Sequence, residues 1–193
     1  KKFYAVNIGE KDYSQKEDII SDIMLSLIHE KIIKFDYFGK KHKVKPYTLM
    51  TFRSGLYLIG YTSLYKEIRM FALDRIINFK KLEENFKYPK NYSPAELFKY
   101  TFGITQGKAE NIILSFTKDI SIYVKERKWH ETARIEERNN TLLLKMECPI
   151  TPELKQWILS CGSSVKVIAP NKLREEIIRE VRNILVTYKK GDK

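Results

Sequence analysis

The chain of 193 residues carries a net charge of +12, and its pI is near 9.5. A hydrophobic fraction of 43% and a charged fraction of 31% are typical of a globular protein and exclude an intrinsically disordered chain. No apolar run reaches the roughly 18 residues that a membrane span needs. No signal peptide opens the sequence either. We therefore expect a cytoplasmic protein without a membrane partner.

The basic charge is concentrated in one part of the chain. Residues 31–81 hold twelve Lys and Arg against three Asp and Glu, a local charge of +9. Such a region favours anionic partners, of which nucleic acids, nucleotides and acidic membrane surfaces are the usual classes. The alternative is that a lysine-rich composition follows from an AT-biased genome and has no functional meaning.

The first half of the chain predicts one helix and five strands. Residues 3–8 are expected to form a strand or a linker arm. Ser14 and Glu17 have the spacing of a capping box, and a helix with one apolar face should follow it to about Lys31. Five short antiparallel strands are then predicted in the stretches IIKFDYF, HKVKPYTLMTF, LYLIGY, IRMFALDR and IINFKKL. Gly55 should supply the positive φ of the turn before the third strand. One helix and five strands suggest a small, strongly bent sheet or barrel.

The second half predicts a regular alternation of strands and helices. Residues 83–92 have no period and are expected to be a linker, after which Ser93 caps a short helix. A strand at 110–116 and a helix at 118–129 precede a hairpin around Asn139 and Asn140. A helix that starts at Thr151-Pro152 and is closed by Gly162, a strand at 163–170 and a long helix from about Asn171 complete the chain. The order β-α-β-β-α-β plus a helix is that of the ferredoxin-like split fold.

Signatures of enzymes and metal sites are missing from the sequence. It has no GxGxxG, Walker A, HExxH or GxSxG motif. The histidines are far apart, and we expect His29 on a helix surface, His42 in a basic turn and His130 at a helix end. Cys148 and Cys161 have no metal-ligand spacing and are expected to be buried free thiols of a reducing cytosol. The sequence predicts no enzyme, no cofactor and no metal.

The positive signal is the interleaving of tyrosines and arginines between residues 31 and 81. Strand alternation puts Arg69 on one face with Phe71 and Leu73, so its charge should lie at the rim of a core or in a polar pocket. Aromatic faces stack on bases, and arginine forks grip phosphate oxygens. The alternative is that Arg69 only pairs with Asp74 or Glu67.

Two stretches of the chain resemble known domains. PYTLMTFRSGLYLIGY followed by IRMFALDRI resembles the WYL domain, an Sm/SH3-like β-barrel of bacterial transcriptional regulators. The tripeptide that names this family is present as Leu56-Tyr57-Leu58, with leucine in place of tryptophan. ILSF, VKERKWH, ETARIEE and LKQWILSCGSSVKVIAP resemble the C-terminal extension of such regulators, the WCX domain.

The resemblance implies an α+β chain in which a small Sm/SH3-like bent β-barrel domain is followed by a ferredoxin-like α/β domain. The expected parts are an N-terminal arm at 1–16, the WYL ligand-sensing domain at 17–82, a linker with a short helix at 83–108 and the WCX domain at 109–193.

In function, the resemblance implies the ligand-sensing and dimerisation part of a transcriptional regulator. The effector would be a single-stranded nucleic acid or a nucleotide, and the protein a homodimer. Promoter DNA would be bound through a helix-turn-helix domain that this chain lacks, either because it is part of a longer regulator or because it acts with a separate DNA-binding protein. By position, Arg69 and Arg75 would hold phosphate, Tyr47 and Tyr57 would stack or hydrogen-bond, and Arg53 is a further basic contact.

Two other readings stay open at this stage. The first alternative is an accessory of a nucleic-acid-processing enzyme. The second is a plain dimerisation module whose arginines only make salt bridges. On the second domain, Lys125, Arg127 and Arg174 are additional basic candidates.

Overall fold

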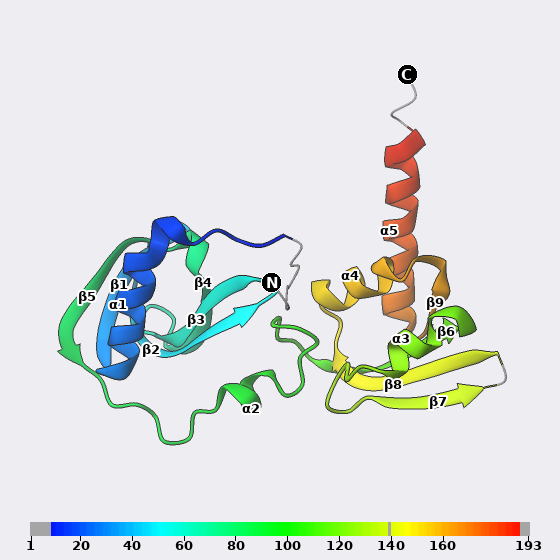
Figure 1. Ribbon diagram of the computed structural model, residues 1–193, viewed down its shortest axis with the longest axis horizontal. Coiled ribbons are helices and arrows are strands. Elements are labelled where there is room, and N and C mark those ends of the chain that lie inside the picture. The colour runs from blue at the N-terminus through cyan, green and yellow to red at the C-terminus, as the bar shows by residue number, and fades with distance from the viewer. Residues whose placement is uncertain (1–8, 139, 190–193) are drawn as a thin grey trace, which may run out of the picture. The chain divides into compact units, whose positions relative to one another are not determined.

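The computed structural model describes residues 9–138 and 140–189. The chain divides into two compact units, unit 1 (Lys1–Tyr92) and unit 2 (Ser93–Lys193), each with its own sheet (Figure 1). Both sheets are antiparallel and both units add helices to them, which confirms the predicted α+β class. The strand or arm predicted at residues 3–8 lies outside the described residues.

Unit 1 is built on a five-stranded sheet with the order β4-β3-β2-β1-β5. Its strands are β1 (Lys31–Tyr37), β2 (Lys40–Phe52), β3 (Gly55–Thr62), β4 (Glu67–Ala72) and β5 (Ile77–Asn85). The strand predicted for IRMFALDR ends at Ala72, because residues Leu73–Arg75 turn into a short 3-10 helix, η2. Within the described residues β4 and β5 do not pair, so the sheet does not close into a barrel.

Helix α1 (Glu17–Ile28) lies against β1, β2 and β5 and buries Ile23 in the core of unit 1. The predicted capping box at Ser14 is wrong. Ser14 begins a 3-10 turn, η1 (Ser14–Lys16), and its backbone N–H donates to the Asp12 carboxylate at 2.8 Å. The helix also ends three residues earlier than expected, because Glu30 adopts a φ of 50° and β1 begins directly after it.

The core of unit 1 gathers apolar side chains from α1, from four strands and from η2. Phe35 and Phe71 meet edge to face at its centre, with ring centroids 5.1 Å apart. The other members are Ile23, Ile33, Val44, Leu58, Leu73 and Ile76.

The turn between β2 and β3 takes its left-handed backbone from residues other than the predicted glycine. Arg53 and Ser54 have φ values of 46° and 60°, as a two-residue hairpin turn with positive φ at both central positions requires. Gly55 is instead buried, and a Cβ there would lie 3.0 Å from the ring of Tyr57.

Unit 2 contains a four-stranded sheet with the order β7-β8-β6-β9 (Figure 1). Its elements are α2 (Pro94–Phe98), β6 (Ala109–Thr117), η3 (Lys118–Ile120), α3 (Ser121–Lys125), β7 (Arg134–Arg138), β8 (Thr141–Pro149), α4 (Pro152–Ser160), η4 (Gly162–Ser164), β9 (Val165–Ala169) and α5 (Asn171–Lys189). The predicted caps form, since Ser93 accepts from the N–H of Glu96 and Thr151 accepts from the N–H of Leu154. Gly162 has a φ of 56°, as expected of a residue just past a helix end.

The helix predicted at 118–129 is much shorter than expected. Only η3 and α3 form, because the indole N–H of Trp129 donates to the carbonyl of Val124 at 2.7 Å and holds the following residues in a turn. The ring of Trp129 then packs on Trp157 of α4 with centroids 4.3 Å apart. Burial in this core raises the pKa of the Cys148 thiol to about 12, and both cysteines are free.

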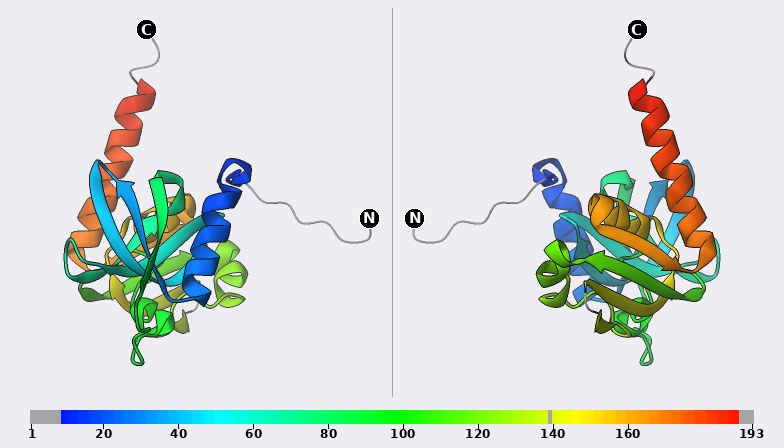
Figure 2. Two further views of the ribbon diagram at one scale, coloured as in Figure 1. Left: turned by 90° about the vertical axis from the view of Figure 1, so that its left-hand side faces the viewer. Right: turned by 90° about the vertical axis from the view of Figure 1, so that its right-hand side faces the viewer.

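Only the beginning of α5 packs on unit 2. Leu173 is buried and Ile177 contacts the core, whereas the rest of the helix extends beyond the sheet (Figures 1 and 2). The exposed apolar residues of this part are Ile178, Val181, Ile184, Leu185, Val186 and Tyr188. No helix in the described part of the chain has the length and hydrophobicity needed to cross a membrane.

Candidate anion-binding site

A continuous series of ring contacts in unit 1 joins Arg69 to Arg75. We call it the aromatic row, and it runs over Tyr65, His42, Tyr37 and Phe38. Its members come from β1, β2, β4 and the turns beside them, so residues far apart in the chain become neighbours. The row lies at the edge of the core, because His42 and Tyr37 also contact the ring of the core residue Phe71.

At one end of the row, two cations meet a single phenol. The Arg69 guanidinium carbon lies 3.6 Å from the centroid of the Tyr65 ring, and the Lys40 ammonium donates to the Tyr65 hydroxyl at 2.9 Å. The hydrogen bond from Lys40, together with the charges of Lys40 and Arg69, lowers the pKa of the Tyr65 hydroxyl. This end of the row is therefore prepared to stabilise negative charge.

Arg69 also makes the ion pair with Glu67 that the sequence offered as an alternative. Both side chains are about half exposed, at 43% and 52%. An exposed pair of this kind contributes roughly 1 kcal/mol or less. A phosphate that brings more charge and more acceptor oxygens can displace Glu67 at small cost.

His42 lies beneath this end of the row and is 3% exposed. Its ring stacks on Phe35 with centroids 5.8 Å apart, and Nδ1 lies 3.2 Å from the Thr62 hydroxyl. Burial lowers the pKa of His42, and the charges of Arg69 and Lys40 lower it further. Both effects favour the neutral imidazole. The prediction that His42 lies in a basic turn is wrong, because β2 begins at Lys40 and includes position 42.

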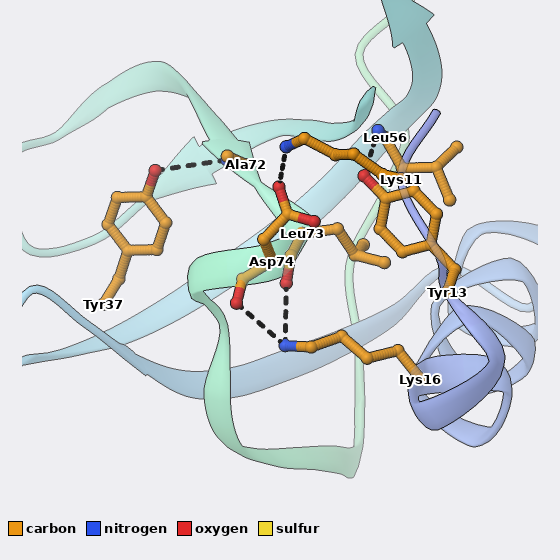
Figure 3. Close-up of polar contacts among 8 residues, drawn as sticks. All are labelled: Lys11, Tyr13, Lys16, Tyr37, Leu56, Ala72, Leu73 and Asp74. Atoms are coloured by element: carbon orange, nitrogen blue, oxygen red, sulfur yellow. Dashed lines mark hydrogen bonds and ion pairs between the residues drawn. The ribbon is translucent and has the colours of Figure 1, made fainter. Parts of the chain in front are cut away.

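At the other end of the row, the Arg75 guanidinium carbon lies 5.3 Å from the centroid of the Phe38 ring. Phe38 is at the tip of the β1–β2 hairpin, has a φ of 48° and is 73% exposed. Its ring contacts Tyr37 with centroids 4.8 Å apart. The Tyr37 hydroxyl accepts from the backbone N–H of Ala72 at 3.2 Å, which fixes the row against β4 (Figure 3).

The turn that carries Arg75 is held by the segment before α1. The Lys16 ammonium donates to the carbonyls of Leu73, Asp74 and Ile76 at 3.2, 3.0 and 3.1 Å. Lys11 pairs with the carboxylate of Asp74 (Figure 3). Asp74 therefore has a structural partner, and η2 is fixed in place from the outside.

The other predicted site residues, Tyr47, Tyr57 and Arg53, are not members of the aromatic row within the described residues. Tyr47 belongs to a second aromatic cluster, with Phe86, Tyr88 and Tyr92. Tyr57 lies in β3 beside Gly55, and the Arg53 guanidinium lies 5.4 Å from the ring of Phe52 at the β2–β3 turn. In the described part of the chain, no ring contact joins these three residues to the row, and their role in binding stays a prediction.

The basic candidates of unit 2 are engaged within that unit. Lys125 pairs with Glu137 at 2.6 Å, and the Arg127 guanidinium carbon lies 4.0 Å from the ring centroid of Tyr123. Arg174 donates to the side chain of Asn171.

Lys40 and Phe38 are the site residues that sequence reasoning missed. Phe38 was expected to end the first strand and Lys40 to lie in the turn after it. Lys40 instead pairs in register with Tyr37 and so lies on the face that carries the core side chains. The alternation of Phe35, Tyr37, Lys40 and His42 around a two-residue hairpin loop is the signal that would have found it.

Comparison with protein families and solved structures locates known domains in both units. A WYL domain model matches residues 18–81 and a WCX domain model matches residues 108–185. No match was found among curated protein sequences.

Two solved structures are similar to the chain over most of its length. A structure of proteasome accessory factor B/C (PafBC) of Arthrobacter aurescens has 16% identity over 93% of this chain, with a TM-score of 0.44. A crystal structure of a CRISPR Cas-related protein has 13% identity over 91% of this chain, with a TM-score of 0.55. The chain spans 29% and 52% of the lengths of these two proteins, and the second likeness is one of fold.

Proposed function

We propose that this chain, which belongs to the WYL-domain proteins and carries a WCX domain behind its WYL domain, is the effector-sensing part of a transcriptional regulator. Its WYL domain would be an open variant of the Sm/SH3-like barrel. Its WCX domain would be ferredoxin-like, which the strand order β7-β8-β6-β9 supports. The observation that carries the functional proposal is the aromatic row with an arginine at each end.

The proposed effector bears phosphate groups and is a single-stranded nucleic acid or a nucleotide. A guanidinium group can donate two parallel hydrogen bonds to two oxygens of one phosphate, and exposed aromatic rings stack on any of the bases. The row offers both, with Arg69 on Tyr65 and Arg75 on the exposed ring of Phe38. The proposal assigns no catalytic step to this site.

Replacement of Arg69 or Arg75 by alanine is expected to weaken binding of short single-stranded oligonucleotides about tenfold or more. A hydrogen bond to a charged group contributes roughly 1.5–3 kcal/mol, and 1.4 kcal/mol is tenfold in affinity. Fluorescence titration at low salt measures the effect, and Arg182→Ala on the exposed part of α5 is the control for net charge. Unchanged affinity in both Arg69→Ala and Arg75→Ala, or no binding to the unaltered protein, would contradict the proposal.

The effector is proposed to act on a homodimer by binding one of its arrangements more tightly than another. A ligand shifts a conformational equilibrium only by such a difference in affinity. Promoter DNA would be contacted by a helix-turn-helix domain of the whole regulator.

The exposed apolar stripe of α5 is the proposed dimer contact. Val181, Ile184 and Leu185 follow helical spacing and are 41–54% exposed, a repeated pattern that buries well against a second copy of the helix. The double replacement Ile184→Glu and Leu185→Glu is expected to convert dimers to monomers in size-exclusion chromatography with light scattering. A single charge on the other side of the helix, Asn183→Glu, should leave the mass unchanged. A dimer that persists in the Ile184→Glu/Leu185→Glu variant would exclude this contact.

A further inference from the structure

A row of lysines crosses three strands of unit 1. Lys80, Lys34 and Lys43 are cross-strand partners on β5, β1 and β2. Like charges directly opposite each other destabilise a sheet, by up to about 1 kcal/mol per pair. Lys43 is neutralised by Glu84 at 2.5 Å, whereas Lys34 and Lys80 have no ion pair within the described residues. The fold thus keeps a repulsive arrangement that an anion would relieve.

A groove of about 390 Å³ lies beside these lysines. Lys34, Lys41, Asp36, Asn78 and Lys80 line it, together with Phe35 and Phe79. The lining thus holds three lysines and one aspartate, and the Asp36 carboxylate already accepts from the Asn78 side chain at 2.7 Å. We call this feature the lysine groove, and its charge suits an anion.

A break in the sheet creates the groove. Lys34 pairs with Lys80, but Asp36 pairs with Ile77, so Asn78 and Phe79 together face a single residue of β1. This is a β-bulge, and its first residue, Asn78, has a φ of 52°, the left-handed conformation of the G1 type. Bulges open a strand pair locally and redirect side chains, which here separates β1 from β5 beside the lysines.

The lysine groove and the aromatic row meet at the tip of the β1–β2 hairpin. Lys40 donates to Tyr65 in the row, and the next residue, Lys41, lines the groove. Successive residues of a strand point to opposite faces, so the two sites lie on the two faces of the same end of the sheet.

We propose that the lysine groove binds further phosphates of the same nucleic-acid strand whose first nucleotides contact the aromatic row. The effector is then an oligonucleotide that passes around the hairpin tip, not a mononucleotide. Neighbouring strands are about 4.8 Å apart. That spacing is shorter than the Debye length of about 8 Å at physiological salt, so the lysines act together on the backbone. Lysine is a point charge without a planar fork, and the contact is independent of base sequence. This inference rests on the proposed function of the aromatic row.

The test compares two double variants that remove the same charge from the same two strands. In Lys34→Gln/Lys80→Gln both lysines belong to the groove, whereas in Lys31→Gln/Lys81→Gln both lysines are already paired, with Glu83 and Asp22. Binding of oligothymidylates of about 4 and about 16 nucleotides, the range of site sizes in single-strand-binding domains, is titrated over a series of salt concentrations.

The groove variant is expected to weaken binding of the long strand and to reduce the slope of log K against log salt by about 1.4, that is, about 0.7 for each lost phosphate contact. Binding of the short strand should be unchanged, and the control variant should keep the full slope. Equal slopes in the two variants, or equal affinity of the unaltered protein for the two strands, would overturn the groove proposal.

Arg69→Ala separates this proposal from the function on which it rests. If Arg69→Ala loses binding of the short strand while the groove variant and the control variant bind the long strand equally well, the groove proposal is refuted and the proposed function stands. Full short-strand binding in Arg69→Ala refutes the aromatic row as the effector site, and with it the path around the hairpin. Circular dichroism of each variant checks that the fold is kept.

Discussion

Gly60→Ala is expected to destabilise the WYL domain by about 2–3 kcal/mol, the cost of overpacking a site that cannot relax. A Cβ at this position would lie 2.5 Å from the Lys45 carbonyl oxygen and 2.6 Å from Cγ1 of Val44. The first is backbone within the β2–β3 ladder and the second is a fully buried side chain, so neither can move away without loss of strand pairing.

The close approach at Gly60 follows from an irregularity in β2. The pairing of β2 with β3 shifts register between Pro46 and Thr48, directly opposite Gly60. Pro46 has no N–H to donate, and the bulge brings the β2 backbone over the glycine. On its other side Gly60 pairs with Arg69, so displacement of β3 would also displace one end of the aromatic row.

The measurement must separate the two units. Both tryptophans, Trp129 and Trp157, lie in unit 2, so tryptophan fluorescence follows that unit only. Hydrogen exchange of the β3 amides in Gly60→Ala should show reduced protection while the fluorescence transition in urea stays in place. The comparison variant is Gly39→Ala, where a Cβ meets open space and the cost of about 1 kcal/mol comes from the positive φ alone. A Gly60→Ala protein as stable as this variant would contradict the overpacking argument.

Lys16→Met is expected to cost about 2 kcal/mol of stability in unit 1 and to weaken effector binding as well. The methionine keeps the apolar length of the side chain but leaves the carbonyls of Leu73, Asp74 and Ile76, in and just after η2, without their donor. Arg75 is the last residue of that turn, so loss of the Lys16 ammonium would also loosen the position of Arg75 and weaken binding there. Oligonucleotide titration and hydrogen exchange of unit 1 measure the two effects.

Lys11→Met is the matched control for Lys16→Met. It removes the same charge from the same segment, but among the described residues Lys11 pairs with a side chain, that of Asp74, at a partly exposed position. We expect a loss of less than about 1 kcal/mol and nearly full binding. Equal losses in the two variants would mean that net charge, not the hydrogen bonds to η2, supports the turn.

The parts of the fold that sequence predicted well are those specified by local patterns. The presence of α1, the caps at Ser93 and Thr151 and the alternation of the strands each depend on neighbouring residues. The expected apolar face of α1 is buried at Ile23 but exposed at Met24 and Ile28. The helix at 118–129 failed because a long-range contact, Trp129 on Trp157, competes with helix propensity. The cap at Ser14 failed because Asp12, two residues earlier, supplies the acceptor.

The candidate site was predictable in its residue types and not in its assembly. Alternation correctly put Arg69 at the edge of the core, and the local charge pointed to an anion. That Arg69 and Arg75 share one series of rings depends on the hairpin tip at Phe38 and on the turn at η2. The lysine groove depends on a bulge between strands more than forty positions apart, as the pairing of Asp36 with Ile77 shows. Neither can be read from spacing along the chain.

The attachment of Lys16 to η2 has a mechanical consequence. One ammonium group links the turn before α1 to backbone carbonyls on both sides of Arg75. An effector that draws Arg75 toward its phosphate would therefore also pull on the entrance to α1. Occupancy of the WYL domain would in this way be transmitted to the segment that leads into α1.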